Sequence, residues 1–191
     1  MVTLVMGGSG SGKSEYGENL ILGLGDRRRI YIATMKPWDE ECESRIERHR
    51  KMRAEKQFET MECYRNLKGL DLGTRGEPGA VLLECMSNLV SNELFGTGEA
   101  EEAPPLTEEQ AVNEIVKGIC HVKEQVRDLV IVTNEVFSDG DSYSEETNGY
   151  RKILGEINKQ AAALADSVVE VVAGIPVIVF EAAVRPMPNS P

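Results

Sequence analysis

The stretch Gly7-Gly8-Ser9-Gly10-Ser11-Gly12-Lys13-Ser14 follows directly on a short apolar run at the N-terminus. It matches the pattern G-x-x-x-x-G-K-[ST]. Glycines let the backbone curl so that successive N–H groups point at phosphate oxygens, and a following helix adds the positive end of its dipole. The lysine can reach the β- and γ-phosphates, and the final serine hydroxyl can bind Mg²⁺. The sequence therefore predicts a loop that binds the phosphates of a nucleoside triphosphate.

Working outward from this loop, apolar runs alternate with helical patterns along the chain. The runs are mostly continuous, which is typical of strands buried on both faces of a parallel sheet. The predicted strands are Val2–Met6, Ile30–Thr34, Ala80–Glu84, Leu129–Thr133 and Val168–Val172, with Ile175–Phe180 forming a hairpin with the fifth. The predicted helices are Lys13–Leu24, Glu40–Lys56, Asn88–Phe95, Thr107–Arg127 and Glu146–Leu164. This order predicts an α/β fold, a mostly parallel sheet flanked by helices with a C-terminal hairpin.

The length of 191 residues favours a single domain over residues 1–184, with a frayed proline-rich tail at 185–191. Gly96–Pro105 combines acids, prolines and glycines, and we expect a mobile surface loop there. The net charge of −11 argues against a protein that wraps nucleic acid. No apolar run approaches the roughly 20 residues that span a bilayer, and no signal peptide precedes the first strand, so we expect a soluble cytoplasmic protein.

Four cysteines, Cys42, Cys63, Cys85 and Cys120, are spread without a C-x-x-C pair. This spacing argues against a structural zinc site and predicts reduced thiols.

Two acidic residues follow predicted strands, where parallel sheets place their ligands. Glu84 ends an apolar strand, as the acid of a Walker B strand does, and Glu135 follows another. Either carboxylate could hold Mg²⁺ or accept a proton from an attacking hydroxyl. Either could equally cap the helix that comes next.

Only two histidines are present, and they differ in position. His49 lies near the apolar face of a basic helix, where nearby positive charge favours the neutral, nucleophilic imidazole. The same cations would stabilise a phosphate under attack. A salt-bridged surface helix is the alternative reading of this stretch. His121 falls opposite the apolar face of its helix, so we expect it to be solvent-exposed and idle.

Several pieces of the chain together resemble one family. They are Gly7–Ser14, Tyr31–Thr34, Arg45-Ile46 with His49, Glu62-Cys63, Leu82–Cys85, Val132–Val136, and Gly155 with Asn158. In this order, and over nearly the whole chain, they resemble the bifunctional adenosylcobinamide kinase/adenosylcobinamide-phosphate guanylyltransferases of cobalamin biosynthesis. The resemblance implies a P-loop, RecA-like fold and a homotrimer.

The resemblance also implies two reactions. A γ-phosphoryl group moves from ATP or GTP to the aminopropanol hydroxyl of adenosylcobinamide, and GMP then moves from GTP onto that phosphate through a guanylylated histidine. The histidine matches His49. From the loop motif and the strand ends we expect Lys13 to act on the bound phosphates and Ser14 and Glu84 to hold Mg²⁺, with no tightly bound organic cofactor. Further nucleotide contacts are implied at Ala33, Thr34, Met35, Arg50, Lys51, Met52, Arg53, Glu62 and Glu84.

The chain departs from the family at two places. Gly10 stands where the family usually has arginine, and Ser138–Asn148 replaces a Glu-Asn-rich lead into the following helix. We expect the second stretch to help bind the corrinoid or the second nucleotide. Two other functions stay open: a P-loop small-molecule kinase in which His49 is structural, and an NTPase switch. The D-x-x-G and N-K-x-D motifs of a Ras-like switch do not occur.

Overall fold

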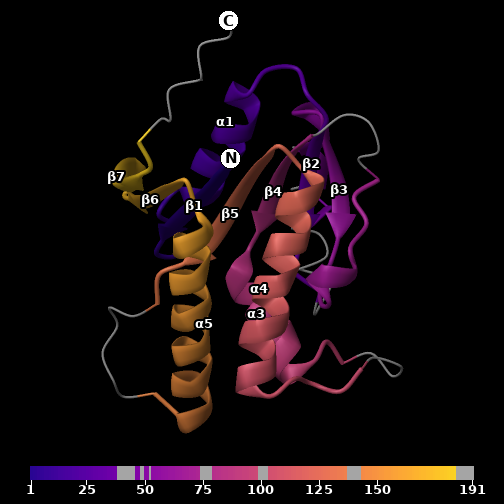
Figure 1. Ribbon diagram of the computed structural model, residues 1–191, viewed down its shortest axis with the longest axis vertical. Helices are drawn as coiled ribbons and strands as arrows, with labels where there is room; N and C mark the ends of the chain where they lie inside the picture. Colours follow the sequence, from indigo (N-terminus) through magenta and orange to yellow (C-terminus); the bar gives the residue numbers. More distant parts are fainter. Residues whose placement is uncertain are drawn as a thin grey trace, which may run out of the picture.

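A computed structural model describes residues 1–37, 46–47, 50–51, 53–73, 79–98, 103–136 and 143–183. A seven-stranded sheet with the order β3-β2-β4-β5-β1-β6-β7 forms its centre (Figure 1). The parallel strands are β1 (Val2–Gly7), β2 (Arg29–Ala33), β3 (Phe58–Glu62), β4 (Ala80–Glu84), β5 (Asp128–Asn134) and β6 (Ser167–Val172). β7 (Ile175–Glu181) pairs antiparallel with β6, which confirms the predicted hairpin.

Helices cover both faces of the sheet, as the alternating pattern predicts. One face carries α3 (Met86–Phe95), α4 (Glu108–Gln125) and α5 (Glu145–Leu164), and α1 (Lys13–Gly23) covers the other. The pleat explains the division, because successive side chains of a strand point to opposite faces. Leu4 of β1 packs into the cluster with α3, α4 and α5, and Val5 packs into the cluster with α1. The predicted RecA-like P-loop α/β fold is confirmed.

The strand β3 is not predicted from the sequence. β3 reads Phe-Glu-Thr-Met-Glu, and only Phe58 of the five is buried. It lies at the edge of the sheet, so it lacks the continuous apolar run of the central strands. A single-turn 3₁₀ helix, η1 (Leu67–Gly69), follows it.

The ends of the longer helices follow local capping rules. Thr107 caps α4 and forms the predicted capping box with Gln110, through hydrogen bonds of 3.0 and 3.4 Å. Ser144 caps α5 by accepting a hydrogen bond from the backbone N–H of Thr147. None of the described helices combines the length and apolar character needed to cross a membrane.

Three sequence predictions concern segments that the structure describes only in part or not at all. Within the predicted helix Glu40–Lys56, residues 46–47, 50–51 and 53–55 are helical. In the predicted loop Gly96–Pro105, the described residues 96–98 and 103–105 have no regular structure. The tail at 185–191 lies outside the described residues. The described cysteines, Cys63, Cys85 and Cys120, are free thiols.

Candidate nucleotide site

The Gly7–Ser14 loop joins β1 to α1, as predicted, and a side chain is disfavoured at two of its glycines, by a clash at Gly7 and by a positive φ with tight packing at Gly12. A Cβ on Gly7 would lie 2.5 Å from Ser11 Oγ and 2.7 Å from the carbonyl oxygen of Val171. Gly12 has a φ of +89°, and a Cβ there would lie 3.3 Å from Gly174 Cα. The loop therefore takes its shape because β1, α1 and the turn between β6 and β7 approach one another so closely.

The polar groups of this loop are arranged for a ligand. Lys13 is buried, and its Nζ donates a hydrogen bond of 3.0 Å back to the carbonyl oxygen of Gly8. Ser11 Oγ is buried and, within the part of the chain that the structure describes, has no hydrogen-bond partner. A buried hydroxyl without a partner is costly, and an anion in the loop would provide one.

Glu84 stands beside the loop at the carboxyl end of β4. Its carboxylate lies beside the side chains of Ser14 and Tyr31. Burial raises the pKa of Glu84 above its ordinary value of 4.5, and hydrogen bonding with these two side chains offsets part of the rise. Among the described residues, Glu84 Oε2 has no partner. A buried carboxylate oxygen next to the loop serine fits a hard divalent cation such as Mg²⁺.

The basic segment that follows His49 packs onto the same face of the sheet. Arg53 is buried with its guanidinium 3.8 Å from the ring centroid of Tyr31. Lys56 pairs with Glu18 of α1 at 2.5 Å. A cation over an aromatic face is attracted by the ring quadrupole. Arg53, Tyr31 and Glu84 therefore form one continuous contact chain from the basic segment to Ser14 of the phosphate loop.

Sheet register brings three predicted contact residues into one row. Ala33 of β2 pairs with Glu62 of β3 on one side and with Glu84 of β4 on the other. Glu62 forms an ion pair with Arg50 and accepts a hydrogen bond of 2.8 Å from the hydroxyl of Tyr64. The predicted contacts on β2, β3 and β4 thus line the carboxyl edge that also carries the phosphate loop.

Other predicted contact residues are placed differently or not described. The side chain of Thr34 is buried and exchanges hydrogen bonds of 2.8 Å with the backbone of Cys85, which leaves it a structural role. Met35 is partly buried beside it. Lys51 pairs with Glu47 on an exposed surface, at 3.1 Å. His49 and Met52 lie outside the described residues.

Two sequence interpretations need correction or addition. His121 is not solvent-exposed: it is half-buried, and its Nε2 lies 3.1 Å from the carbonyl oxygen of Leu70. The connection after β3 passes over that side of α4, which helical position alone does not reveal. The sequence pattern assigns Tyr31 only to a strand, whereas in the structure its side chain also meets Glu84. Glu135 hydrogen-bonds Gly7 through its backbone N–H, at 3.0 Å.

The two departures from the family pattern have plain structural readings. Gly10 has a φ of +70°, and a Cβ on it would meet no atom within 4 Å, so the missing side chain leaves the loop itself intact. In the second stretch, residues 138–142 lie outside the described residues. Ser144 caps α5, and Asn148 donates to the carbonyl oxygen of Tyr143 at 3.1 Å. These residues shape the start of α5.

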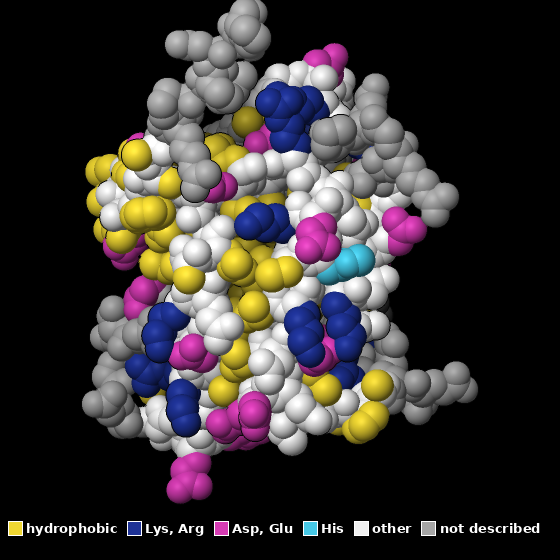
Figure 2. All heavy atoms as spheres, in the orientation of Figure 1, with side chains coloured by type: hydrophobic (Ala, Val, Ile, Leu, Met, Phe, Trp, Pro, Cys, Tyr) yellow, Lys and Arg dark blue, Asp and Glu magenta, His cyan; other side chains and the backbone are white. Residues whose placement is uncertain are grey.

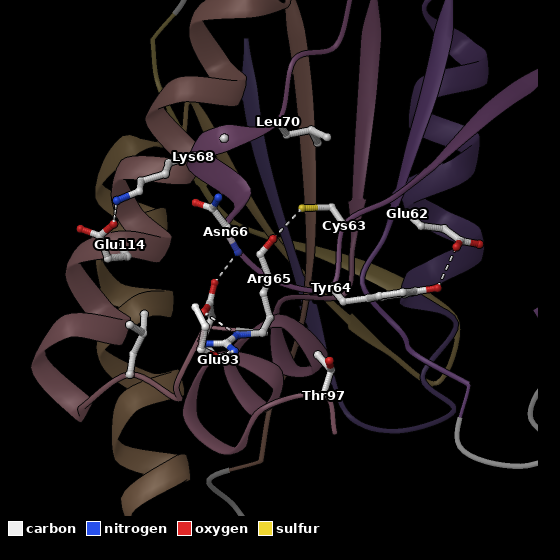
Figure 3. A pocket seen from close by; sticks show the side chains of 13 residues that line it. Glu62, Cys63, Tyr64, Arg65, Asn66, Lys68, Leu70, Glu93, Thr97 and Glu114 are labelled. Atoms are coloured by element: carbon white, nitrogen blue, oxygen red, sulfur yellow. Dashed lines mark hydrogen bonds and ion pairs between the residues drawn. The ribbon is translucent and has the colours of Figure 1, made fainter. Parts of the chain in front are cut away.

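A cavity of about 560 Å³ lies beyond Glu62, under the connection that follows β3 (Figure 3). Its walls come from that connection, from the end of α3 and from the start of α4. The residues lining it are Glu62, Cys63, Tyr64, Arg65, Asn66, Lys68, Gly69, Leu70, Glu93, Thr97, Ala103, Leu106 and Glu114. Burial raises the pKa of the Cys63 thiol to about 11, which keeps it protonated.

The fold and the loop together define a P-loop nucleotide-binding α/β protein. The family described as cobinamide kinase / cobinamide phosphate guanyltransferase (CobU) matches residues 3–179. The chain is 38% identical over 180 residues to the bifunctional adenosylcobalamin biosynthesis protein CobU of Escherichia coli K12, covering 92% of this chain and 97% of that one. It is 35% identical over 180 residues to the protein of the same name from Salmonella typhimurium LT2, with the same coverage. The chain belongs to this family of kinases and guanyltransferases.

A solved structure of the flagellar accessory protein FlaH from Methanocaldococcus jannaschii aligns with a TM-score of 0.47 at 11% identity, covering 95% of this chain and 78% of that one. That similarity is too low to add to the assignment.

Replacing Glu84 by glutamine tests its environment directly. Because the folded state raises the pKa of Glu84, it binds the proton more tightly than the unfolded state does. The wild-type chain therefore loses stability as pH rises above the ordinary value of 4.5 and through the folded pKa. Glu84→Gln should raise the free energy of unfolding at pH 8 and change it much less at pH 5, in urea denaturation without nucleotide or Mg²⁺.

Glu124→Gln, at an exposed position of α4, is the matched control and should show no such difference. A Glu84→Gln protein that is less stable than wild type at pH 8 would contradict this account of the site.

Proposed function

We propose that the chain phosphorylates adenosylcobinamide with ATP or GTP and then transfers GMP from GTP to adenosylcobinamide phosphate through a guanylylated His49. The observation that carries the proposal is the meeting of Ser14 and Glu84 beside the glycine loop, at the carboxyl edge of the sheet. Membership of the family supports the two reactions and their substrates.

The kinase step needs positioning and charge neutralisation rather than a covalent intermediate. The backbone N–H groups of the loop and the Lys13 ammonium would hold the β- and γ-phosphates. Lys13 Nζ must exchange its present bond to Gly8 for a phosphate oxygen, so the nucleotide replaces an internal partner. Ser14 and Glu84 would hold Mg²⁺, which neutralises charge that develops on the transferred group.

The guanylyl-transfer step uses a different group. A neutral imidazole of His49 would attack the α-phosphorus of GTP, forming an N–P bond as the bond to the pyrophosphate oxygen breaks. The phosphate of the corrinoid then attacks the same phosphorus and releases the histidine. Arg50 and Arg53 follow His49 in the sequence, and their positive charge supports the proposal because it would favour a phosphorus centre under attack.

Covalent labelling separates the two halves of the proposed function. GTP labelled at the α-phosphate should label the protein through a bond that is acid-labile and base-stable, as a phosphoramidate is. His49→Asn should abolish the label, whereas His121→Asn should keep it, because His121 lies on α4 against the Leu70 carbonyl. If the wild-type protein does not become labelled, that result would contradict guanylyl transfer and leave only the kinase reaction of the proposal.

We further propose that β7 forms the interface of the homotrimer that the family resemblance implies. β7 is an edge strand, and its apolar side chains gather on the surface seen in Figure 2. Ile175 and Ile178 are 66% and 62% exposed. A contiguous apolar patch on an unpaired sheet edge favours association. The exposed apolar residues of this hairpin are Val172, Ile175, Val177, Ile178, Val179 and Phe180.

Sedimentation velocity tests this interface. Ile178→Lys should convert a wild-type trimer into monomers, because it places a charge within the apolar patch. Phe95→Lys is the matched control, since Phe95 is also exposed but belongs to α3, and it should leave the trimer intact. A trimer that survives Ile178→Lys would contradict the role of β7.

A further inference from the structure

Two hollows meet at Glu62. The first, of about 600 Å³, is lined by Arg50, Ala54, Phe58, Thr60 and Glu62. The second is the cavity of about 560 Å³ shown in Figure 3, which we name the Asn66 pocket, with the lining residues given above. Glu62 is the residue that the two linings share. The first hollow contains Arg50, one of the implied nucleotide contacts, so a nucleotide held by Arg50 would lie close to the Asn66 pocket.

The charges of the Asn66 pocket are already paired. Arg65 and Glu93 form a largely buried ion pair at 3.1 Å, with side-chain exposures of 12% and 5%. Lys68 pairs with Glu114 (Figure 3), and Glu62 pairs with Arg50. An anionic ligand would have to compete with these partners, and separating the buried Arg65–Glu93 pair is costly. The pocket therefore suits a ligand part that is uncharged.

The remaining lining mixes apolar surface with neutral hydrogen-bonding groups. Leu70, Ala103 and Leu106 supply apolar surface, and Asn66 and Tyr64 add an amide and a phenol. The rim of a corrin ring carries methyl groups and primary amides, which match this lining in kind. The volume falls within the ordinary range for small-molecule sites, and it accommodates one edge of such a ring. The rest of the ring would extend toward solvent.

We propose that the Asn66 pocket binds the amide-bearing rim of the corrinoid acceptor during guanylyl transfer. The proposal rests on the proposed function, because it assigns a place to the acceptor of that reaction. The aminopropanol phosphate arm would cross Glu62 toward the hollow beside Arg50 and meet the nucleotide there. In the sheet order β3 stands four positions from β1, about 19 Å at the usual strand spacing. The pocket is therefore placed for the histidine-borne nucleotide rather than for the phosphate loop.

Two tryptophan substitutions, one in each hollow, test this assignment. Ala103 and Ala54 are both exposed, so a larger side chain at either position fills its hollow without disturbing the core. Arg65 donates a hydrogen bond to the backbone carbonyl oxygen of Ala103, a contact that the substitution keeps. Two measurements are made on each protein. The first is equilibrium dialysis with cobinamide phosphate, whose visible absorbance reports its concentration. The second is covalent labelling with GTP labelled at the α-phosphate.

Ala103→Trp should raise the Kd for cobinamide phosphate at least tenfold and leave covalent labelling unchanged, which also shows that the variant is folded. Ala54→Trp should slow labelling, and it should weaken binding of cobinamide phosphate less than Ala103→Trp does, because only the phosphate arm reaches its hollow. Wild-type affinity for cobinamide phosphate in Ala103→Trp would overturn the assignment while leaving the proposed function standing. A wild-type protein that is labelled but binds no cobinamide phosphate would contradict the substrate of the proposed function and the pocket together.

Discussion

The close approach of three backbone segments at Gly7 and Gly12 is the constraint on which the rest of the structure depends. The end of β1, the start of α1 and the β6–β7 hairpin come so near that a side chain at Gly7 would collide with the Val171 carbonyl oxygen, and one at Gly12 would be tight against Gly174 and strained by the positive φ. The backbone N–H of Gly174 donates to the carbonyl oxygen of Ser11 at 2.8 Å and ties the turn to the loop. The hairpin therefore supports the phosphate loop from one side, and β5 flanks it from the other.

A chain of contacts carries this geometry across the sheet. Ser14, in the first turn of α1, meets Glu84 of β4, Glu84 meets Tyr31 of β2, and Tyr31 lies under the guanidinium of Arg53. Each link joins an element that is remote in sequence, so the chain depends on the parallel sheet to bring the strand ends together. The family combines a kinase and a guanyltransferase. In this chain Ser14, Glu84, Tyr31 and Arg53 form one connected row at the carboxyl edge of the sheet.

Much of the fold could be predicted from the sequence because its central strands are buried on both faces. Both faces of a central strand such as Ala80–Glu84 are buried, so its sequence is continuously apolar instead of alternating. Both of its bounds were predicted correctly. β3 was missed because an edge strand with two glutamates has neither continuous apolar character nor a partner on its far side. The phosphate loop could be predicted because its chemistry is local, set by consecutive residues between one strand and one helix.

The remainder of the site depends on tertiary contacts that local patterns do not contain. The hydroxyl of Tyr31 meets Glu84 only because β2 and β4 are neighbours in register. His121 follows the same rule: its helix face predicts exposure, but a connection 51 residues earlier in the chain covers it. The contact residues on β2, β3 and β4 came from the family resemblance, and the register shows why they belong to one edge.

The central claim is that the Gly7–Ser14 loop, closed by Lys13, is where the nucleoside triphosphate binds. Isothermal titration calorimetry of GTP with Mg²⁺, on the wild type and on Lys13→Ala, tests it most directly. The account predicts that the wild-type chain binds GTP and that Lys13→Ala weakens binding at least tenfold, with an unchanged circular dichroism spectrum. A Lys13→Ala protein that binds GTP as tightly as the wild type would contradict it.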